Sequence, residues 1–143
     1  MERISNLEVK RLSTDATLPT RAYPDDAGLD IYGLEDALIA PSEGKMVSTG
    51  VALAIPAGHV GMVCDRSSMA KKGIKTAGGI IDAGYRGELK IVLWNLSKDQ
   101  IRITRGERIA QLLVLPIQTP AVREVSELSV ATRGDKGFGS SGR

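Results

Sequence analysis

Short apolar strands separated by glycine and proline turns recur through most of this chain, and they constrain its fold more than any other feature. β-Branched and other apolar residues gather in residues 46–55, 60–64, 89–96 and 108–115, with turn residues between these segments. No long helical segment intervenes, which disfavours a parallel β–α–β architecture. The pattern predicts an all-β fold, a jelly-roll-like antiparallel barrel or sandwich with one short helix.

Length, cysteine usage and charge narrow the functional classes. The chain of 143 residues fits one domain, and its single cysteine and single histidine can form neither an internal disulfide nor a Cys/His zinc site. A reducing compartment such as the cytoplasm is therefore expected. No apolar run approaches the roughly 20 residues that cross a bilayer, and no targeting segment is recognised. A net charge of +2, with one Trp, three Tyr and one Phe, argues against polymeric nucleic acid as a ligand.

Residues 78–88 combine a short apolar strand, an acid, an aromatic residue and turn glycines. Ile80 and Ile81 favour an extended backbone, and Gly84 and Gly87 permit turns with positive φ, so we expect a β-hairpin whose second strand runs through residues 88–96. Backbone groups in such a hairpin can bind the edge of a flat heterocycle, and Tyr85 can pack on a sugar ring. The alternative is an ordinary hairpin with a solvated Asp82 and a half-buried tyrosine.

Residues 65–73 are rich in charged and hydroxyl side chains, in contrast to the apolar segment before them, and they suggest an anion site. Ser67 or Ser68 can cap a short helix over residues 69–72 that stops at Gly73. Free N–H groups, hydroxyl donors and the Arg66 guanidinium would then converge on one place. The alternative is plain helix capping beside a solvated arginine.

Two polar residues stand inside apolar strands. Asp30 is either an acid on an edge strand that faces water or a carboxylate held near a cation. Gln111 interrupts the apolar run at 108–115, and because a buried glutamine needs hydrogen-bond partners, it either bonds neighbouring backbone or faces a ligand.

Residues 133–143 form a glycine-rich tail that carries the only phenylalanine, Phe138. Such a segment cannot hold one conformation by itself. Either it is a disordered terminus, or it is a flap that orders over a bound ligand and covers a base with Phe138. The second possibility divides the chain into a core of residues 1–132 and a flap of residues 133–143.

Five separated stretches resemble, in order, the motifs of the trimeric dUTP pyrophosphatases, or dUTPases. The stretches are residues 27–30, 66–68, 79–82 with 85–87, 106–112, and 133–142. Each motif is weak alone, but five in the correct order are specific and span nearly the whole chain. The two central motifs are shared with the related dCTP deaminases.

The resemblance implies a jelly-roll homotrimer in which each of three active sites draws motifs from more than one subunit. It implies hydrolysis of dUTP to dUMP and pyrophosphate, which keeps uracil out of DNA and supplies dUMP for thymidylate synthesis. It implies that Gly79, Ile80 and Ile81 bind uracil through backbone groups, and that Tyr85 packs on deoxyribose and leaves no room for a 2′-hydroxyl. It also assigns Asp82 the activation of the water that attacks the α-phosphorus.

The same resemblance implies how the triphosphate and its Mg²⁺ are held. The metal would be bound mainly by phosphate oxygens and waters, with Asp30 in contact through water. The rigid body would supply phosphate ligands, namely Arg66, Ser67, Ser68 and Gln111. The tail would close over the substrate with Arg133, Phe138, Gly139, Ser140 and Ser141.

Three positions depart from the family pattern. Gly84 replaces a second acid, which changes only the turn geometry, and Thr76 replaces an asparagine that would contact the pyrimidine. Asp65 stands where proline is frequent and places a negative charge beside the phosphate site, so we expect it to pair with a basic neighbour.

Two other functions compete with dUTP hydrolysis. A dCTP deaminase, or a bifunctional relative, would need an essential glutamate in the strand after the hairpin, whereas Glu88 lies too near the turn to be assigned that role. A nucleotide-sensing regulator would bind dUTP and signal to a protein partner through the tail. Asp82 and the complete tail favour turnover over sensing alone.

Overall fold

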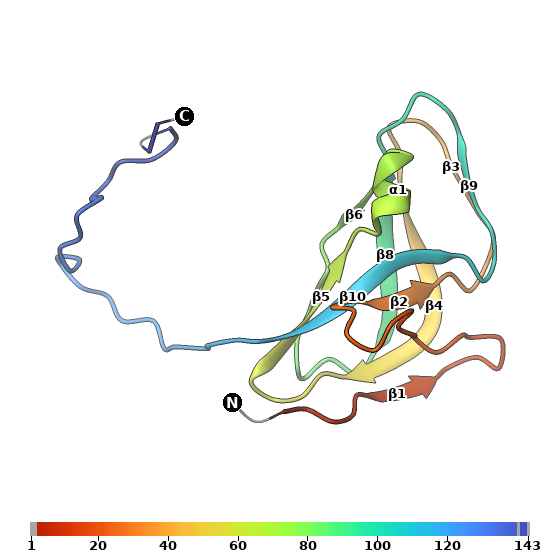
Figure 1. Ribbon diagram of the computed structural model, residues 1–143, viewed down its shortest axis with the longest axis horizontal. Coiled ribbons are helices and arrows are strands. Elements are labelled where there is room, and N and C mark those ends of the chain that lie inside the picture. Colours follow the sequence, from red (N-terminus) through yellow and green to blue (C-terminus); the bar gives the residue numbers. More distant parts are fainter. Residues whose placement is uncertain (1–2, 140, 143) are drawn as a thin grey trace.

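The computed structural model describes residues 3–139, 141 and 142, and it is built almost entirely of antiparallel strands (Figure 1). One four-stranded sheet has the order β1 (Glu8–Arg11), β4 (Gly44–Ala54), β8 (Glu88–Asn95), β6 (Ile74–Ala77). The other has the order β2 (Leu29–Tyr32), β10 (Arg108–Pro116), β5 (His59–Cys64), β7 (Ile80–Ile81). A two-stranded ribbon joins β3 (Ala37–Ile39) to β9 (Ile101–Ile103). The expected antiparallel all-β class is confirmed.

The hydrophobic core lies between the two sheets and draws on both. Strands β4 and β8 contribute Val51 and Ile91, while β2 and β10 contribute Ile31 and Leu112. These side chains are at most 1% exposed, so the sheets pack as the two layers of a sandwich.

Strand β8 differs from its expected burial. It was expected to be central, and β4 and β6 do flank it. However, its apolar run predicted two dry faces, whereas Leu89 and Ile91 are buried and Lys90 and Trp94 are exposed. The reason is that only one face of this sheet meets the core. The outer face of β8 therefore carries an indole that the chain itself leaves 42% exposed.

The expected hairpin at residues 78–88 is wrong in its pairing. β8 pairs with β6, whereas β7 pairs with β5 in the opposite sheet, with Ile81 opposite Gly61. Positive φ occurs at Gly78 and Gly79, at 71° and 97°, rather than at the expected Gly84 and Gly87. These two glycines turn the chain out of one sheet so that Ile80 and Ile81 can enter the other. Residues 82–87 consequently connect the two sheets.

The only helix in the described part of the chain is α1 (Ser67–Lys71), which comes directly after β5 and the short turn at residues 65 and 66. It ends as expected, because Gly73 has a φ of 90°. No helix among the described residues is both long enough and apolar enough to span a membrane.

After Pro116 the chain leaves the sandwich and runs away from it (Figure 1). Every described residue from Ile117 onward is exposed, and Phe138 is fully so. The N–H of Ile117 still donates to the carbonyl of Gly58 at 2.9 Å, whereas farther along the hydrogen bonds join residues close in sequence, such as the N–H of Gly134 to the carbonyl of Ala131 at 3.2 Å. The division at residues 132 and 133 stays a prediction.

Candidate functional site

An arginine cluster forms where β2, β10 and the β5–α1 turn meet, and we define it as Asp30, Arg66, Arg108 and Gln111. The Nε of Arg66 donates to Oδ1 of Asp30 at 3.2 Å, and Nη1 of Arg108 lies 3.6 Å from Oδ2 of the same carboxylate. Arg66 also donates to the backbone carbonyl of Arg108 at 3.1 Å. Of the two alternatives for Asp30, the carboxylate near a cation is therefore the one observed.

Gln111 lies at the centre of this cluster because of strand register. It stands opposite Asp30 on one side of β10 and opposite Cys64 on the other. Its Nε2 donates to the backbone carbonyl of Asp65 at 2.8 Å. A Cβ at Gly28 would overlap the Gln111 amide, so glycine is needed there for the amide to approach the backbone. The interior glutamine thus bonds backbone, and its Oε1 can still accept a hydrogen bond from a ligand.

The two serines of the expected anion site come immediately after Arg66. The helix begins at Ser67 with Arg66 as its N-cap, and neither serine makes a side-chain cap hydrogen bond. The capping expectation is therefore wrong, since both serines belong to the first helical turn. Both are exposed beside the guanidinium. Their hydroxyls remain available to a ligand that reaches Arg66.

Asp65 has the basic partner that its position led us to expect. Its Oδ2 lies 2.9 Å from Nζ of Lys75, while its Oδ1 accepts from both the N–H and the hydroxyl of Thr76, each at 2.7 Å. Partial burial acts to raise the pKa of Asp65, but the hydrogen bonds from Lys75 and Thr76 outweigh burial and hold this pKa below its ordinary value. The carboxylate is charged and fully engaged at neutral pH.

A groove of about 320 Å³ lies on the loop between β7 and β8, and we call it the β7–β8 groove. Four of the expected site residues belong to it together with three others. Its lining is Met46, Ile80, Ile81, Asp82, Tyr85, Glu88 and Lys90. Asp82 is exposed within this groove and begins the turn, since its carbonyl accepts the N–H of Tyr85 at 3.1 Å.

Tyr85 is held by its own loop. Its hydroxyl donates to the carbonyl of Glu88 at 2.7 Å, and Arg86 braces the turn by donating to the carbonyl of Ala83 at 2.6 Å. A Cβ at Gly87 would lie 2.5 Å from the tyrosine hydroxyl, so Gly87 provides space for the ring rather than a special φ. Oε2 of Glu88 meanwhile accepts the N–H of Gly50 at 3.1 Å, which gives this acid a structural partner.

The arginine cluster and the groove flank the same strand. In the sheet order β2-β10-β5-β7, the cluster lies on the β2 and β10 side of β5, and Ile80 and Ile81 lie on the other side. β2 and β7 are three strand spacings apart, which corresponds to about 14 Å. Gly79 belongs to the connection, where its carbonyl accepts the N–H of Val63 at 2.8 Å.

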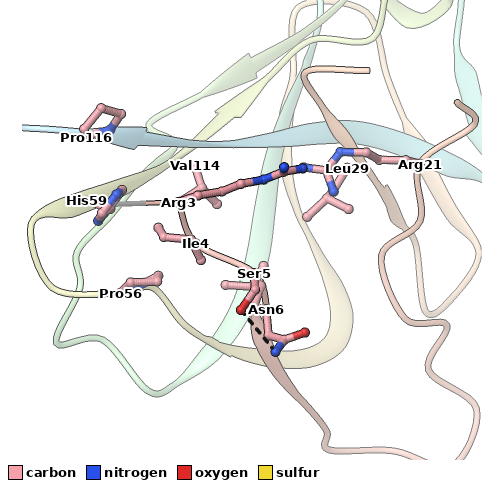
Figure 2. Close-up of a pocket in the computed structure, with 11 residues that line it drawn as sticks. Arg3, Ile4, Ser5, Asn6, Arg21, Leu29, Pro56, His59, Val114 and Pro116 are labelled. Carbon is pink, nitrogen blue, oxygen red and sulfur yellow. Dashed lines mark hydrogen bonds between the residues drawn. The ribbon is translucent and has the colours of Figure 1, made fainter. Parts of the chain in front are cut away.

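Another cavity, of about 330 Å³, lies elsewhere, between the N-terminal segment and the end of β10 (Figure 2). Arg3, His59 and Val114 line it, and none of the expected site residues does. Nδ1 of His59 lies 2.9 Å from the carbonyl of Ala57, within the turn that precedes β5.

The described tail residues of the predicted site lie apart from the arginine cluster and the β7–β8 groove. Arg133 donates to the carbonyl of Lys136 at 2.7 Å, and Phe138, Gly139 and Ser141 are exposed. Ser140 lies outside the described residues.

No cluster of three or more His, Cys, Asp or Glu side chains suited to a metal occurs in the described ranges. Asp30 is a single carboxylate whose side chain is 16% exposed, and it sits among cations that also attract phosphates. That donor set fits a metal that keeps its waters and takes most ligands from a substrate.

The sequence alone assigned no role to three residues of the cluster and the groove, which are Arg108, Met46 and Lys90. Arg108 shares the Asp30 carboxylate, but it lies in an apolar run where charge alone did not mark it. Met46 and Lys90 enter the groove from β4 and β8, and only the pairing of these strands brings them together.

Comparison with known proteins gives a consistent result. The dUTPase family model matches residues 14–142. A deoxyuridine 5′-triphosphate nucleotidohydrolase of Corynebacterium jeikeium is 48% identical, with 95% of this chain and 92% of that protein covered. Its counterpart in Corynebacterium glutamicum is 44% identical, with 100% and 99% covered. The structure of Staphylococcus bacteriophage 80alpha dUTPase with dUPNHPP superposes with a TM-score of 0.92 at 37% identity, over 98% of this chain and 100% of that one.

Proposed function

We propose, since this chain belongs to the dUTPase family and hydrolyses dUTP to dUMP and pyrophosphate, that its active site has two halves. The two halves are the β7–β8 groove and the arginine cluster. The observation that carries this proposal is that expected site residues gather in these two regions, an exposed acid and an aromatic ring in the groove and two arginines in the cluster.

The groove is the proposed nucleoside half. Backbone groups of Gly79, Ile80 and Ile81 would bind the polar edge of uracil, because an extended backbone presents N–H and C=O groups at fixed spacing. Tyr85 would lie against deoxyribose and exclude a 2′-hydroxyl. Its hydrogen bond to the Glu88 carbonyl supports this role, since it fixes the ring before substrate arrives.

Asp82 is the proposed general base. Its carboxylate would accept a proton from water while the water oxygen forms a bond to the α-phosphorus. The bond from that phosphorus to the α,β-bridging oxygen breaks, and pyrophosphate leaves with the electron pair. The exposure of Asp82 in the groove, at the start of the loop that carries Tyr85, supports this assignment.

The arginine cluster is the proposed phosphate half. A triphosphate carries about four negative charges, and catalysis of its cleavage depends on stabilising the charge that develops on the leaving group. Arg66, Ser67, Ser68 and Gln111 would bind phosphate oxygens from the rigid body. Arg66 is already oriented by Asp30 and by the Arg108 carbonyl, which favours binding without further ordering.

Mg²⁺ is the proposed cofactor, with Asp30 touching it through water. The ion would neutralise charge on the phosphates and polarise their oxygens. In a related protein, the dUTPase of phage phi11 of S. aureus, a structural Mg(II) ion is described. In this chain Asp30 would also keep Arg66 and Arg108 in place as phosphate ligands.

The proposed assembly is a homotrimer with active sites shared between subunits. The outer face of β4 and β8 supports an interface, because Met46 and Trp94 are 61% and 42% exposed there. The detached tail supports sharing, since residues 117–139 run away from the sandwich that carries both halves. Arg133, Gly139, Ser140 and Ser141 would then close on phosphates, and Phe138 would cover uracil, in one of the three sites. We also infer a cytoplasmic location, in keeping with the free thiol of Cys64.

The test is pyrophosphate release with Mg²⁺ from dUTP, dTTP, dCTP and UTP in parallel, for the full chain and for a chain ending before Arg133. We expect hydrolysis of dUTP alone, largely lost on truncation. Pyrophosphate release from dUTP that is unaffected by truncation would contradict a role for residues 133–143 in hydrolysis. Equal release from UTP would overturn the role of Tyr85, and ammonia from dCTP would indicate a deaminase.

A further inference from the structure

Glu88 makes contacts at the β7–β8 groove with both its side chain and its backbone. It begins β8 and lines the groove. Its Oε2 accepts the N–H of Gly50 at 3.1 Å, and its backbone carbonyl accepts the hydroxyl of Tyr85 at 2.7 Å. The same residue therefore connects the ring of Tyr85 to strand β4.

The contact to Gly50 falls where the pairing of β4 with β8 is interrupted. The register shifts between Ser48 and Ala52, and we call residues 49–51 the β4 bulge. An interrupted ladder leaves backbone N–H groups that need other acceptors. Gly50 is buried in this bulge with a φ of 71°, and the carboxylate of Glu88 accepts its N–H. The side chain of Glu88 thus fixes the start of β8 to β4.

The β4 bulge is itself held firmly by the rest of the chain. The N–H of Leu12 donates to the carbonyl of Gly50 at 2.7 Å, and the hydroxyl of Thr49, which is 1% exposed, donates to the carbonyl of Leu89. Gly50 packs so tightly that an added Cβ would lie 2.9 Å from the side chain of Ala16. The bulge is therefore a rigid support for Glu88.

We infer that Glu88 is a positioning residue for Tyr85, and that it thereby contributes to selectivity for deoxyribose over ribose. Its carboxylate holds the start of β8 on the β4 bulge, and its carbonyl then holds the tyrosine hydroxyl. The inference rests on the proposed contact of Tyr85 with deoxyribose, and it concerns the groove alone. Glu88 touches no reacting atom in this scheme.

The acceptor oxygen of Glu88 carries this role rather than its charge. The donor is a neutral backbone N–H, so an uncharged acceptor can replace the carboxylate. Glu88→Gln keeps such an oxygen, whereas Glu88→Ala removes it and leaves the buried N–H of Gly50 without this partner. The start of β8 can then shift, and Tyr85, which is 46% exposed, has room to move with the carbonyl that holds it.

The experiment measures kcat/KM for dUTP, UTP and dTTP in the full chain and in five variants. Four of them are Glu88→Ala, Glu88→Gln, Tyr85→Phe and the double variant that combines Glu88→Ala with Tyr85→Phe. The fifth is the matched control Asp36→Ala, because Asp36 also accepts a backbone N–H, that of Arg105 at 2.7 Å, but lies by the β3–β9 ribbon. UTP differs from dUTP in the sugar and dTTP differs in the base, so two ratios separate the two contacts.

We expect Glu88→Ala to lower the ratio of kcat/KM for dUTP over UTP about fivefold, while the ratio for dUTP over dTTP stays within about twofold. Tyr85→Phe should lower the first ratio by a similar factor. Glu88→Gln and Asp36→Ala should stay within about twofold of the unmodified chain in both ratios. A loss of folded protein lowers kcat/KM for every substrate equally and changes neither ratio.

The double variant tests whether Glu88 acts through the tyrosine hydroxyl. When Tyr85→Phe has already removed that hydroxyl, Glu88→Ala should change the ratio for dUTP over UTP by less than about twofold, because coupled residues are not additive. An undiminished effect of Glu88→Ala in that background would overturn the inference.

Three further results would overturn it. They are an unchanged ratio for dUTP over UTP in Glu88→Ala, a loss in Glu88→Gln equal to that in Glu88→Ala, and an equal fall of both ratios in Glu88→Ala. If Glu88→Ala does not fold, Glu88→Asp withdraws the carboxylate by one methylene and should lower the first ratio about threefold. An unchanged ratio there would count equally against it. Equal hydrolysis of UTP and dUTP by the unmodified chain would instead refute the proposed sugar contact of Tyr85, so the two failures are distinguished in one assay.

Discussion

The arginine cluster and the β7–β8 groove flank the same strand, yet they hold their functional groups in opposite ways. In the cluster, charged side chains fix one another, since the Asp30 carboxylate lies between Arg66 and Arg108. In the groove, the loop backbone holds the residues, and Asp82 is an exposed acid at the start of its turn. The cluster is ordered before a ligand arrives, whereas the groove offers one ordered ring beside an exposed acid.

In the proposed scheme, this difference divides the work of binding and of proton transfer between the two regions. Binding a triphosphate gains from charges that need no reorganisation, which the ion pairs provide. Proton transfer gains from a carboxylate that is accessible to water, which the turn provides. Substitutions in the cluster should therefore alter binding and stability together, while those in the groove should alter rate or selectivity at nearly constant stability.

The largest effect is expected from Asp82→Asn in the groove. Removing a general base should lower kcat by about 10³-fold. Binding of dUTP should change little, because the carboxylate of Asp82 is not needed to hold the phosphates. Single-turnover hydrolysis and equilibrium dialysis measure the two quantities, with Asp25→Asn as an exposed control. A parallel loss of binding would mean that the groove, like the cluster, acts mainly by holding the substrate.

Arg66→Gln in the cluster should lower kcat/KM for dUTP by about 10²-fold, through lost charge at the phosphates. It should also reduce stability by about 1 kcal/mol, because Asp30 loses a charged hydrogen-bond donor. Urea unfolding and steady-state kinetics provide the measurements. Arg102→Gln is the matched control, since its pair with Asp36 is largely exposed and should contribute little. Reduced activity without any loss of stability would contradict the view that the ion pairs of Asp30 hold the arginines of the cluster in place.

Gly28→Ala tests the same half without changing charge. The added Cβ would displace the Gln111 amide, and overpacking of this kind costs about 1–3 kcal/mol. We expect KM for dUTP to rise about tenfold, since one phosphate ligand is moved. Calorimetry and kinetics test both effects. A normal KM in a destabilised variant would contradict the proposal that Gln111 is a phosphate ligand.

Gly87→Ala makes the equivalent change in the groove, where a Cβ would meet the Tyr85 hydroxyl. Tyr85 is 46% exposed and can swing outward, so we expect little loss of stability. Discrimination of dUTP against UTP should fall about fivefold as the ring leaves the sugar position. Gly84→Ala is the control, because no atom beyond its two chain neighbours lies within 4 Å of its added Cβ. Equal discrimination in both variants would contradict a sugar contact by Tyr85.

The smallest effect concerns pH and Asp65, whose backbone carbonyl accepts a hydrogen bond from Gln111 of the cluster. Its pKa is below the ordinary 3.8 in the folded chain, so the unfolded chain binds more protons in acid. The carboxylate's contribution to stability is therefore present in full above about pH 5 and is lost as pH falls through the folded pKa. Urea midpoints should fall more steeply from about pH 5 to about pH 3 for the unmodified chain than for Asp65→Asn. Parallel curves would contradict this.

The sequence predicted the class of fold because strand signals are local. Alternation marks β9, a nearly continuous apolar run ending at Pro116 marks β10, and Gly73 marks the end of α1, all without knowledge of partners. Pairing was less predictable. Ile80 and Ile81 lie near β8 in sequence, and only the paired positive φ of Gly78 and Gly79 directs them to β5 instead.

The candidate site divides in the same way between local and long-range information. Asp30, Arg66 and Gln111 were selected as polar residues in unusual settings, and the strand register brings them together. Arg108, Met46 and Lys90 carried no such signal, because their places depend on which strands become neighbours. The pairing of Asp65 with a basic residue was expected from its charge, whereas its bonds to Thr76 required the position of β6.

The position of β10 has a consequence for how the protein is made. This strand is the last of those described but sits inside its sheet, between β2 and β5, and its Ile109, Ala110 and Leu112 are 0% exposed. During synthesis, the edges of β2 and β5 that face β10 stay unpaired until Pro116 has left the ribosome. Unpaired strand edges can associate with other chains. Gln111 arrives on that same strand, so the arginine cluster also forms in the final step of folding. A nascent chain of this protein should therefore complete its core and its arginine cluster together.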